Sequence, residues 1–304
     1  MLAIVIPYYK IRFFEATLQS LVLQTDKRFK VYIGNDASNE DPTQLLEKFQ
    51  NQFDFEYQYY ETNLGSISLT QQWERCMARV QEEDWVMILG DDDTIDFNCV
   101  ALFYQNIERI QKDNCDVIRY ATQVIDQHNV ALSGIHTHPR YETSTDFLMR
   151  KFKGGTHSSL SEFVFYKKSL EQVQFKNFPL AWYSDLLAVL EVSNFGLIYT
   201  ISEAVVSFRL SGDNITSRTD NLVLKNEGTF QFLYYLLDQK KSFFEEEQLA
   251  VLRQKLEKTF LDNKKNLQFW TLFTKLYFRE WYVKNYLKFL YTAAMMTINK
   301  IKLK

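Results

Sequence analysis

The stretch that most constrains the fold is an apolar run that ends in three consecutive carboxylates. Residues 85–89 read Trp-Val-Met-Ile-Leu, and Gly90 is followed by Asp91, Asp92 and Asp93. A short, uninterrupted apolar run is typical of a strand that is buried on both faces of a parallel sheet. Three adjacent carboxylates repel one another and are costly to hold together without a cation. We therefore expect a divalent metal, and through it a phosphorylated ligand, where open α/β sheets bind their ligands.

The first 90 residues alternate between strand and helix patterns. Four apolar segments are predicted to be strands, at residues 3–6, 29–34, 53–60 and 85–89. The stretches between them place apolar residues at helical spacing. This order predicts right-handed crossovers and a mainly parallel sheet. No Gly-x-Gly-x-x-Gly or Walker A sequence opens any of these helices, which argues against dinucleotide binding and P-loop chemistry.

Further along the chain the pattern is less regular. The last helix of the first 90 residues is expected at 66–81. Beyond them the expected elements are a helix at 97–110, strands at 116–125, 161–166, 196–201 and 204–210, and a helix that opens near residue 182. From about residue 222 onward only helical patterns remain, which predicts a C-terminal helical extension.

Composition limits the localisation and the partners. The length of 304 residues suits one large α/β domain with an appendage, or two domains. The three cysteines fit no zinc spacing and no secretory signal precedes them, so we expect reduced thiols in a cytoplasmic protein. The main domain carries no basic footprint for nucleic acid.

The C-terminal tail is basic and aromatic. From residue 264 onward nine Lys or Arg residues stand against one acid, Glu280, and aromatic residues such as Trp270, Trp281 and Tyr282 lie among them. Charges interrupt each apolar run before it reaches about 20 residues, so no spanning helix is expected. Such a segment suits peripheral contact with the inner face of an anionic membrane. Packing on the main domain or on a second subunit is the alternative.

Six short motifs follow one another in the first 215 residues. They read Ile-Val-Ile-Pro-Tyr-Tyr-Lys at 4–10, Leu-Gln-Ser-Leu-Val-Leu-Gln-Thr at 18–25, Gly-Asn-Asp-Ala-Ser-Asn-Glu-Asp at 34–41, Asn-Leu-Gly at 63–65, Gly-Asp-Asp-Asp at 90–93 and Ser-Asp at 184–185. In this order and at these separations they resemble the family 2 glycosyltransferases, which have the GT-A fold.

The resemblance implies an α/β fold with a mainly parallel, Rossmann-like central sheet and flanking helices. Residues 1–218 would form the catalytic domain, with nucleotide-sugar binding in 1–95 and the acceptor side in 96–218, and residues 219–304 the helical extension. The implied reaction is an inverting, metal-dependent hexosyl transfer from a nucleoside diphosphate-sugar to a saccharide or lipid-linked saccharide. The implied product is a cell-surface polysaccharide or glycolipid.

The three aspartates would hold the metal. The diphosphate of the donor is negatively charged, and Mg²⁺ or Mn²⁺ bound by carboxylates neutralises it. The family pattern is Asp-x-Asp; Gly90 replaces its first aspartate in one alignment, and Asp91 and Asp93 form the pair in the other. We expect Asp92 as a metal ligand, Asp93 in support at the metal, and Asp91 near the ribose or the metal. The alternative is capping of the following helix.

Residues after the first two strands would bind the nucleoside. In the family an aspartate at the position of Asp36 recognises the base, and Asn35 replaces the aspartate that usually precedes it. UDP- and dTDP-sugars are favoured, and guanosine donors stay open. Pro7 and Tyr9 would border the same pocket, where Tyr9 could stack on the base. The alternatives are a helix cap at Asp36 and core packing of Tyr9.

Asp185 is the candidate catalytic base. An inverting transfer needs a carboxylate that takes the proton from the acceptor hydroxyl. The resemblance places this aspartate at the start of a helix after an aromatic loop, here Trp182 and Tyr183, and Ser184 replaces the usual glutamate. A cap role is the alternative. Arg209 would contact the pyrophosphate, although the histidine often found nearby is absent.

Two other functions stay open. A nucleotidyltransferase of related fold also uses carboxylate-bound metal, but it normally has a Gly-rich, basic segment after the first strand, and residues 6–10 do not provide one. A non-catalytic nucleotide-sugar-binding homologue would keep the fold with decayed chemistry. The substitutions Asn35, Gly90 and Ser184 favour that alternative.

Overall fold

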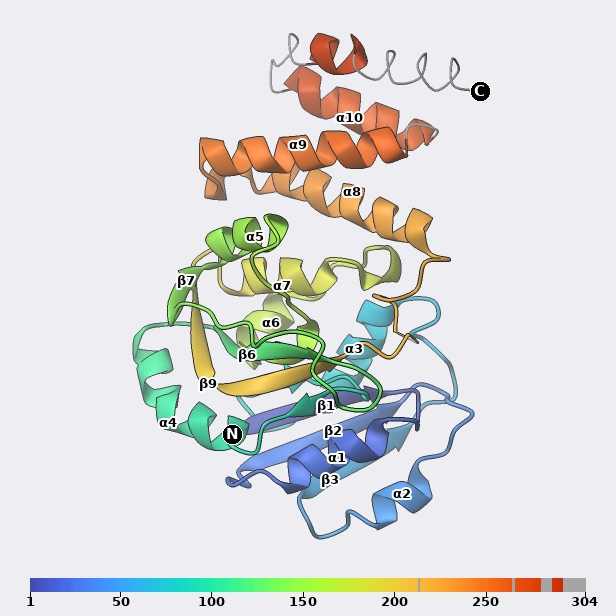
Figure 1. Cartoon of the computed structure of the whole chain (residues 1–304), viewed down its shortest axis with the longest axis vertical. Helices are drawn as coiled ribbons and strands as arrows, with labels where there is room; N and C mark the ends of the chain where they lie inside the picture. Colours follow the sequence, from blue (N-terminus) through green and yellow to red (C-terminus); the bar gives the residue numbers. More distant parts are fainter. Residues whose placement is uncertain (213, 264–265, 280–285, 292–304) are drawn as a thin grey trace. The chain divides into compact units, whose positions relative to one another are not determined.

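The computed structural model describes residues 1–212, 214–263, 266–279 and 286–291 (Figure 1). Contacts divide the chain into two compact units. The first unit is Met1–Asn177 with Ser184–Thr219, and the second unit is Phe178–Tyr183 with Asp220–Lys304. Within the described part of the chain, no helix is both long and apolar enough to cross a membrane.

The first unit is built on a nine-stranded sheet with the order β3-β2-β1-β4-β8-β6-β9-β5, in which β7 pairs with β9. The strands are β1 Leu2–Tyr8, β2 Phe29–Asn35, β3 Asp54–Tyr59, β4 Trp85–Ile88, β5 Thr94–Ile95, β6 Val117–Ile125, β7 Tyr141–Thr143, β8 Phe163–Tyr166 and β9 Leu197–Arg209. Strands β3, β2, β1 and β4 are parallel, whereas β8 is antiparallel to both β4 and β6. The α/β prediction is confirmed.

The helices of the first unit connect these strands. They are α1 Phe14–Val22, α2 Thr43–Glu47, α3 Leu69–Met77, α4 Cys99–Lys112, α5 Ser144–Phe152, α6 Lys167–Val173, α7 Ser184–Val192 and the 3₁₀ helix η1 Leu160–Glu162. Helix α3 is shorter than the predicted 66–81, because Ser68 caps its start by accepting a hydrogen bond from the Gln71 N–H.

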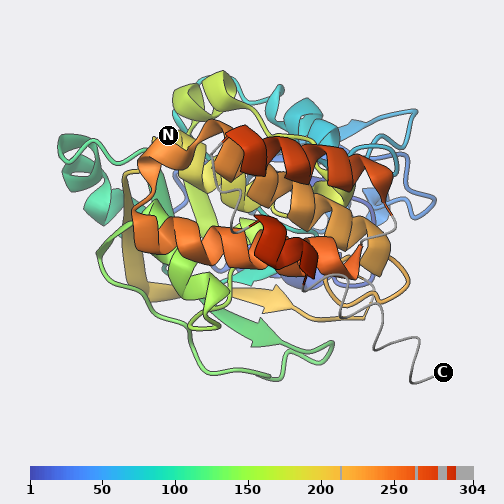
Figure 2. The same ribbon diagram turned by 90° about the horizontal axis from the view of Figure 1, so that it is seen from above.

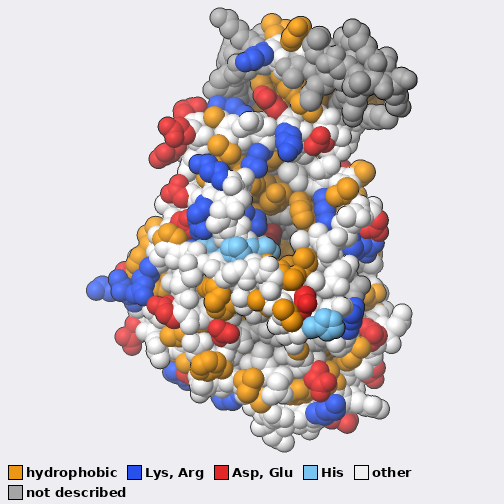
Figure 3. Space-filling model, viewed as in Figure 1, with side chains coloured by type: hydrophobic (Ala, Val, Ile, Leu, Met, Phe, Trp, Pro, Cys, Tyr) orange, Lys and Arg blue, Asp and Glu red, His pale blue; other side chains and the backbone are white. Residues whose placement is uncertain are grey.

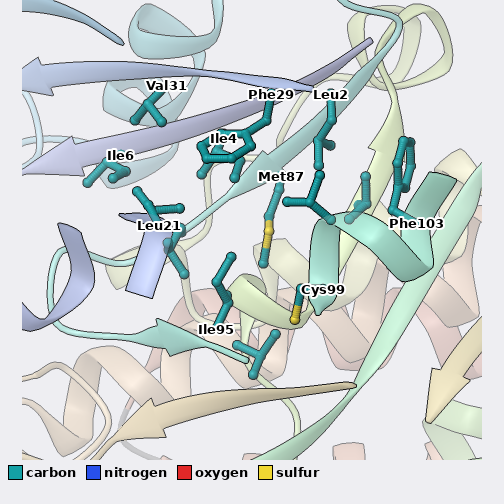
Figure 4. Packing of buried hydrophobic residues seen from close by; sticks show 14 of the residues in the cluster. Leu2, Ile4, Ile6, Leu21, Phe29, Val31, Met87, Ile95, Cys99 and Phe103 are labelled. Atoms are coloured by element: carbon teal, nitrogen blue, oxygen red, sulfur yellow. The ribbon is translucent and has the colours of Figure 1, made fainter. Parts of the chain in front are cut away.

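The core lies where β1 and its neighbours meet α1 and α4 (Figure 4). Alternate residues of β1, Leu2, Ile4 and Ile6, join one apolar cluster with α1 and α4. Val5, on the other face of the strand, is fully buried as well. Burial on both faces explains why the central strands read as continuous apolar runs.

Two strand predictions were wrong in detail. Segments 196–201 and 204–210 are one strand, β9, because Tyr120 of β6 pairs with Ile201 whereas Ala121 pairs with Val205. The polar residues Ser202 and Glu203 lie inside this register shift. The predicted strand 161–166 begins as η1, and only Phe163–Tyr166 is extended.

The second unit is helical, as predicted for the C-terminal extension. Its elements are η2 Pro179–Ala181, α8 Leu222–Gln239, η3 Lys241–Phe243, α9 Glu246–Asp262 and α10 Leu267–Arg279. Helices α8, α9 and α10 lie side by side (Figure 2). Aromatic rings join them, since Phe230 stacks on Phe269 with centroids 3.8 Å apart and Phe260 contacts Phe273 at 4.6 Å.

Candidate active site

The acidic turn, residues 90–93, follows β4 directly. Strand β4 is parallel to β1, and the Leu89 N–H continues their ladder by donating to the Val5 carbonyl. The turn therefore lies beside the segment that follows β1. This is the carboxyl edge of the parallel half of the sheet, where ligands bind in open α/β sheets.

The Asp91 carboxylate ties the turn to that segment. Its Oδ2 accepts hydrogen bonds from the backbone N–H groups of Tyr9, at 2.7 Å, and Lys10, at 2.8 Å. Burial raises the pKa of Asp91, and these two N–H donors and the Lys10 charge oppose the rise. Hydrogen bonds to backbone N–H groups stabilise the charged form of a carboxylate. Asp91 thus sets the distance between the ends of β1 and β4.

Asp93 is held inside the protein and is only 3% exposed. Its Oδ2 accepts a hydrogen bond of 2.5 Å from Ser161 Oγ, and its Oδ1 accepts one of 2.9 Å from the Arg209 N–H. Burial raises its pKa to about 6. Because both oxygens are engaged by protein donors, the geometry gives Asp93 a supporting position; direct coordination of a metal by Asp93 stays a prediction.

Asp92 is the carboxylate of the three that accepts no hydrogen bond from another side chain or from a neighbouring loop among the described residues. Burial raises its pKa well above the ordinary value, and the charges of Asp93 and Asp91 raise it further. A cation bound here would relieve both effects. Coordination of a metal by Asp92 stays a prediction.

Gly90 leaves space for these carboxylates. A Cβ at this position would lie 3.0 Å from Asp93 Oδ2 and 3.2 Å from Asp92 Oδ1. A side chain at residue 90 would therefore press on both groups. The glycine that replaces a family aspartate fits the packing of the turn as it stands.

Three polar side chains on α1 and just after it, which an apolar pattern does not reveal, hold the backbone of the turn and of the segment that follows it. Thr17 Oγ1 donates to the Asp93 carbonyl at 2.8 Å, Ser20 Oγ accepts from the Ile95 N–H at 3.3 Å, and Gln24 accepts from the first turn of α4. All three side chains are buried. Thr17 and Ser20 are three residues apart in α1 and share one helix face, and Gln24 follows the end of the helix.

Asp36 follows β2 and accepts hydrogen bonds from the loop after β3. Its Oδ1 accepts hydrogen bonds from the Leu64 N–H at 2.7 Å and from Arg75 Nη2 at 2.6 Å, and its Oδ2 accepts one from the Gly65 N–H at 2.8 Å. The capping alternative is wrong, because α2 begins at Thr43 without a side-chain cap. Recognition of the base by Asp36 stays a prediction.

Pro7 and Tyr9 lie next to Asp36. The Asp36 N–H donates to the Tyr8 carbonyl at 3.1 Å, and Ser38 Oγ donates to the Tyr9 carbonyl at 2.5 Å. The Tyr9 side chain is 43% exposed, so core packing does not explain it. Pro7 is half-buried in β1. The ends of β1 and β2 thus bring together the residues predicted to border the nucleoside.

Arg209, at the end of β9, is fully buried. Its Nε donates to the Asp92 carbonyl at 2.8 Å, its Nη1 donates to the Asp126 carbonyl at 2.9 Å, and its guanidinium lies 4.7 Å from the centre of the Phe13 ring. Nη2 is buried and has no partner among the described residues. Arg209 therefore braces the turn, and contact with a pyrophosphate through Nη2 stays a prediction.

Asp185 lies in the first turn of α7 and is half-buried. Burial raises its pKa, and the charge of Lys151 on α5, which packs on α7, opposes the rise. The neighbouring Ser184 is buried and donates from Oγ to the Lys176 carbonyl at 2.6 Å. Among the described residues no hydrogen bond links Asp185 to the acidic turn.

His138 and His157 pack against other side chains of the first unit. His138 is 9% exposed, its Nδ1 contacts Arg150 Nη2 at 2.5 Å, and burial lowers its pKa to about 2. The His157 ring packs 5.0 Å from Phe208. Histidine side chains still contribute to the surface drawn in Figure 3. No group of three or more His, Cys, Asp or Glu residues in the described part of the chain is arranged to hold a metal.

The fold and the turn define an α/β protein with three carboxylates at the carboxyl edge of its parallel strands. The model of glycosyl transferase family 2 matches residues 3–173, more than half of the chain, and the chain belongs to that family. The matched range contains the acidic turn, Asp36 and Ser161. Asp185 and Arg209 lie beyond it.

Solved structures share the GT-A fold. Residues 1–349 of S. aureus TarS in complex with UDP-GlcNAc match with a TM-score of 0.63 and 17% identity, over 85% of this chain and 72% of that one. The structure described simply as S. aureus TarS has a TM-score of 0.60 and 16% identity, and only 43% of it is covered. GalNAc-T7 with UDP, GalNAc and Mn²⁺ has a TM-score of 0.51 and 11% identity, with 86% and 56% covered. No curated protein sequence matches the chain.

Proposed function

We propose that this protein is an inverting, metal-dependent hexosyltransferase that moves a sugar from a nucleoside diphosphate-sugar to a saccharide or lipid-linked saccharide. The observation that carries the proposal is the acidic turn. Asp91 and Asp93 are fixed by backbone and side-chain donors, whereas the Asp92 carboxylate accepts none from the surrounding described residues. The family membership of the chain makes sugar transfer the reaction to test.

Mg²⁺ or Mn²⁺ is the proposed cofactor. Asp92 is its proposed protein ligand, and Asp93 supports Asp92 at the metal. Mg²⁺ is usually bound through one or two carboxylates together with substrate phosphates, so one available carboxylate fits this mode. Bound there, the ion would neutralise charge on the departing nucleoside diphosphate. The structure of GalNAc-T7 with Mn²⁺ supports the choice of metal.

The proposed donor is a UDP-sugar, with a dTDP-sugar as the second choice. S. aureus TarS was solved with UDP-GlcNAc and with UDP, and GalNAc-T7 with UDP. In this chain, Asp36, Pro7 and Tyr9 lie at neighbouring strand ends, and Asp91 touches the backbone of Tyr9. We assign the nucleoside to this edge, with Asp91 on its ribose side and Arg209 Nη2 toward the pyrophosphate.

Asp185 is the proposed general base. Burial raises its pKa, and a base whose pKa lies closer to the working pH transfers protons more effectively. With Asp185 as the base at the start of α7, we assign residues 96–218 to the acceptor side of a proposed catalytic domain that spans residues 1–218. Residues 219–304 are then an accessory extension to that domain.

The C-terminal tail is proposed to make peripheral contact with the inner face of a membrane, where a lipid-linked acceptor would lie. In α10, Phe269 and Phe273 pack inside the second unit, so packing accounts for part of the aromatic pattern. Phe278 is 58% exposed, and Tyr291 is 68% exposed. Trp281 and Tyr282 lie outside the described residues. Co-sedimentation with anionic vesicles that persists unchanged after deletion from Leu267 to the end of the chain would contradict membrane contact through the tail.

The donor proposal is tested with a panel of nucleoside diphosphate-sugars, with and without Mn²⁺, read by thermal shift and by hydrolysis of the donor. UDP-sugars with Mn²⁺ are expected to raise the melting temperature and to be hydrolysed slowly. Asp54→Asn removes an exposed carboxylate from β3. It is the matched control for substitution of a carboxylate in the acidic turn, and it should behave as the wild type. Binding without hydrolysis or transfer would favour the non-catalytic homologue, and formation of a nucleotide-sugar from a nucleoside triphosphate would favour a nucleotidyltransferase.

A further inference from the structure

The Ser161 hydroxyl connects the beginning and the end of the acidic turn. Its Oγ accepts a hydrogen bond of 3.1 Å from the Gly90 N–H and donates one of 2.5 Å to Asp93 Oδ2. Ser161 belongs to η1, which packs against β4, and its side chain is 4% exposed. A short hydroxyl–carboxylate bond inside the protein is stronger than a neutral one. Ser161 therefore closes the turn from a separate element of the chain.

Hydrogen bonds connect Asp93 to Arg209 and Arg209 to Asp92, so the position of Asp93 also restrains Asp92. Asp93 Oδ1 accepts from the Arg209 N–H, and Arg209 Nε donates to the Asp92 carbonyl. These bonds restrain the backbone on both sides of the Asp92 side chain, whose carboxylate accepts no hydrogen bond from the surrounding residues that the structure describes. A carboxylate that is held in place before binding loses less freedom when a ligand arrives.

We propose that Ser161 is a positioning residue of the donor site, which orients the Asp92 carboxylate through Asp93 for the metal-bound diphosphate. This inference rests on the proposed function, because it requires a divalent cation and a nucleoside diphosphate at the turn. In this proposal Ser161 acts through Asp93 and not by contact with either ligand. Its effect therefore belongs to the affinity of metal-dependent nucleotide binding and not to the chemistry of transfer.

The test is calorimetric titration of the full chain with UDP in the presence and absence of Mn²⁺. Ser161→Ala is expected to weaken Mn²⁺-dependent UDP binding about tenfold, the loss that one strong hydrogen bond supports. Ser169→Ala is the matched control. Ser169 Oγ also donates to an aspartate, Asp116 Oδ2 at 2.6 Å, away from the acidic turn. This variant should bind UDP as the wild type does.

The double variant Asp93→Asn with Ser161→Ala distinguishes an effect of Ser161 through Asp93 from a general loss of stability. In an Asp93→Asn background, Ser161→Ala should add less than about twofold, because the bond it removes is already altered. If Ser161→Ala does not fold, Ser161→Cys keeps the volume, retains only weak hydrogen bonding and is expected to weaken binding severalfold. A wild type that binds no UDP with Mn²⁺ would overturn the proposed function. Wild-type affinity in the folded Ser161 variant, or an equal loss in Ser169→Ala, would overturn the positioning role alone.

Discussion

The Arg75 guanidinium donates a hydrogen bond of 2.6 Å to Asp36 and stacks on Tyr60, with its central carbon 3.9 Å from the ring centre. Asp36 in turn accepts from the Leu64 and Gly65 N–H groups. Two segments that are 28 to 39 residues away from Asp36 along the chain thus converge on one carboxylate. This cluster fixes the edge on which the proposed nucleoside pocket is built.

Removal of the cation from this cluster should destabilise the fold. Arg75→Met keeps the apolar stem but leaves the nearly buried Asp36 carboxylate without its cation, so we expect the free energy of unfolding to fall by about 1–3 kcal/mol. Urea denaturation measures this change. Arg79→Met is the control, because its pair with Glu56 is partly exposed and should contribute less than about 1 kcal/mol. Equal effects of the two variants would contradict the structural role of Arg75.

Gly34 in β2 has no room for a side chain. A Cβ there would overlap Cys76 Sγ on α3 and would lie 3.1 Å from the Tyr60 ring. Gly34→Ala is therefore expected to destabilise the protein by about 1–3 kcal/mol through overpacking. In a Cys76→Ala background the same change should be milder, because the sulfur is gone. Thermal denaturation of the wild type, the two single variants and the double variant gives the coupling energy between the two positions. Additive effects would mean that the two side chains do not compete for space.

Stability should depend on pH through Glu162. Burial raises the pKa of this fully buried carboxyl to about 8 from an ordinary 4.5. Between these values the unfolded chain releases the proton while the folded chain keeps it, so the folded state loses stability as the pH rises, by up to about 1.4 kcal/mol per pH unit. Glu162→Gln cannot ionise and should lack this loss. The difference between the two proteins is measured by urea denaturation between about pH 5 and 8, and parallel curves would contradict the raised pKa.

Asp185→Asn should separate transfer from binding. With no base for the acceptor hydroxyl, the transfer rate is expected to fall about 100-fold or more. The affinity for UDP with Mn²⁺ should stay unchanged. For the wild type, the raised pKa of Asp185 predicts that kcat/KM falls on acidification at a higher pH than an ordinary aspartate would give. Glu191→Gln on the same helix is the control; transfer that survives in Asp185→Asn would assign the base elsewhere.

The local sequence pattern was sufficient to predict the strands in the parallel half of the sheet. The apolar run at residues 85–89 is buried as β4, and the carboxylates stand at its end, because a central strand is apolar on both faces and must stop where polar residues begin. The register shift in β9 escaped prediction, since it depends on pairing with β6. The polar pair Ser202 and Glu203 looks the same in sequence whether it ends a strand or lies within an irregular one.

The partners of the carboxylates could not be found from sequence. Ser161 lies 68 residues from Asp93, and Arg209 lies 116 residues from it, so only the fold brings them together. The six motifs indicated which carboxylates lie near the candidate site. They did not indicate which of these carboxylates accept hydrogen bonds from other parts of the protein. That distinction comes from the folded geometry alone, and it is one ground on which we propose Asp92 as the metal ligand.

The central claim is that Asp92 holds the metal through which a nucleoside diphosphate binds. The most direct measurement is the Kd of UDP, with and without Mn²⁺, for the wild type and for Asp92→Asn, with urea denaturation of both proteins. The wild type is expected to bind more tightly with Mn²⁺, and Asp92→Asn to lose about 30-fold or more of that affinity while remaining folded. Equal affinity of the two proteins in Mn²⁺, or wild-type binding that does not depend on Mn²⁺, would contradict the claim.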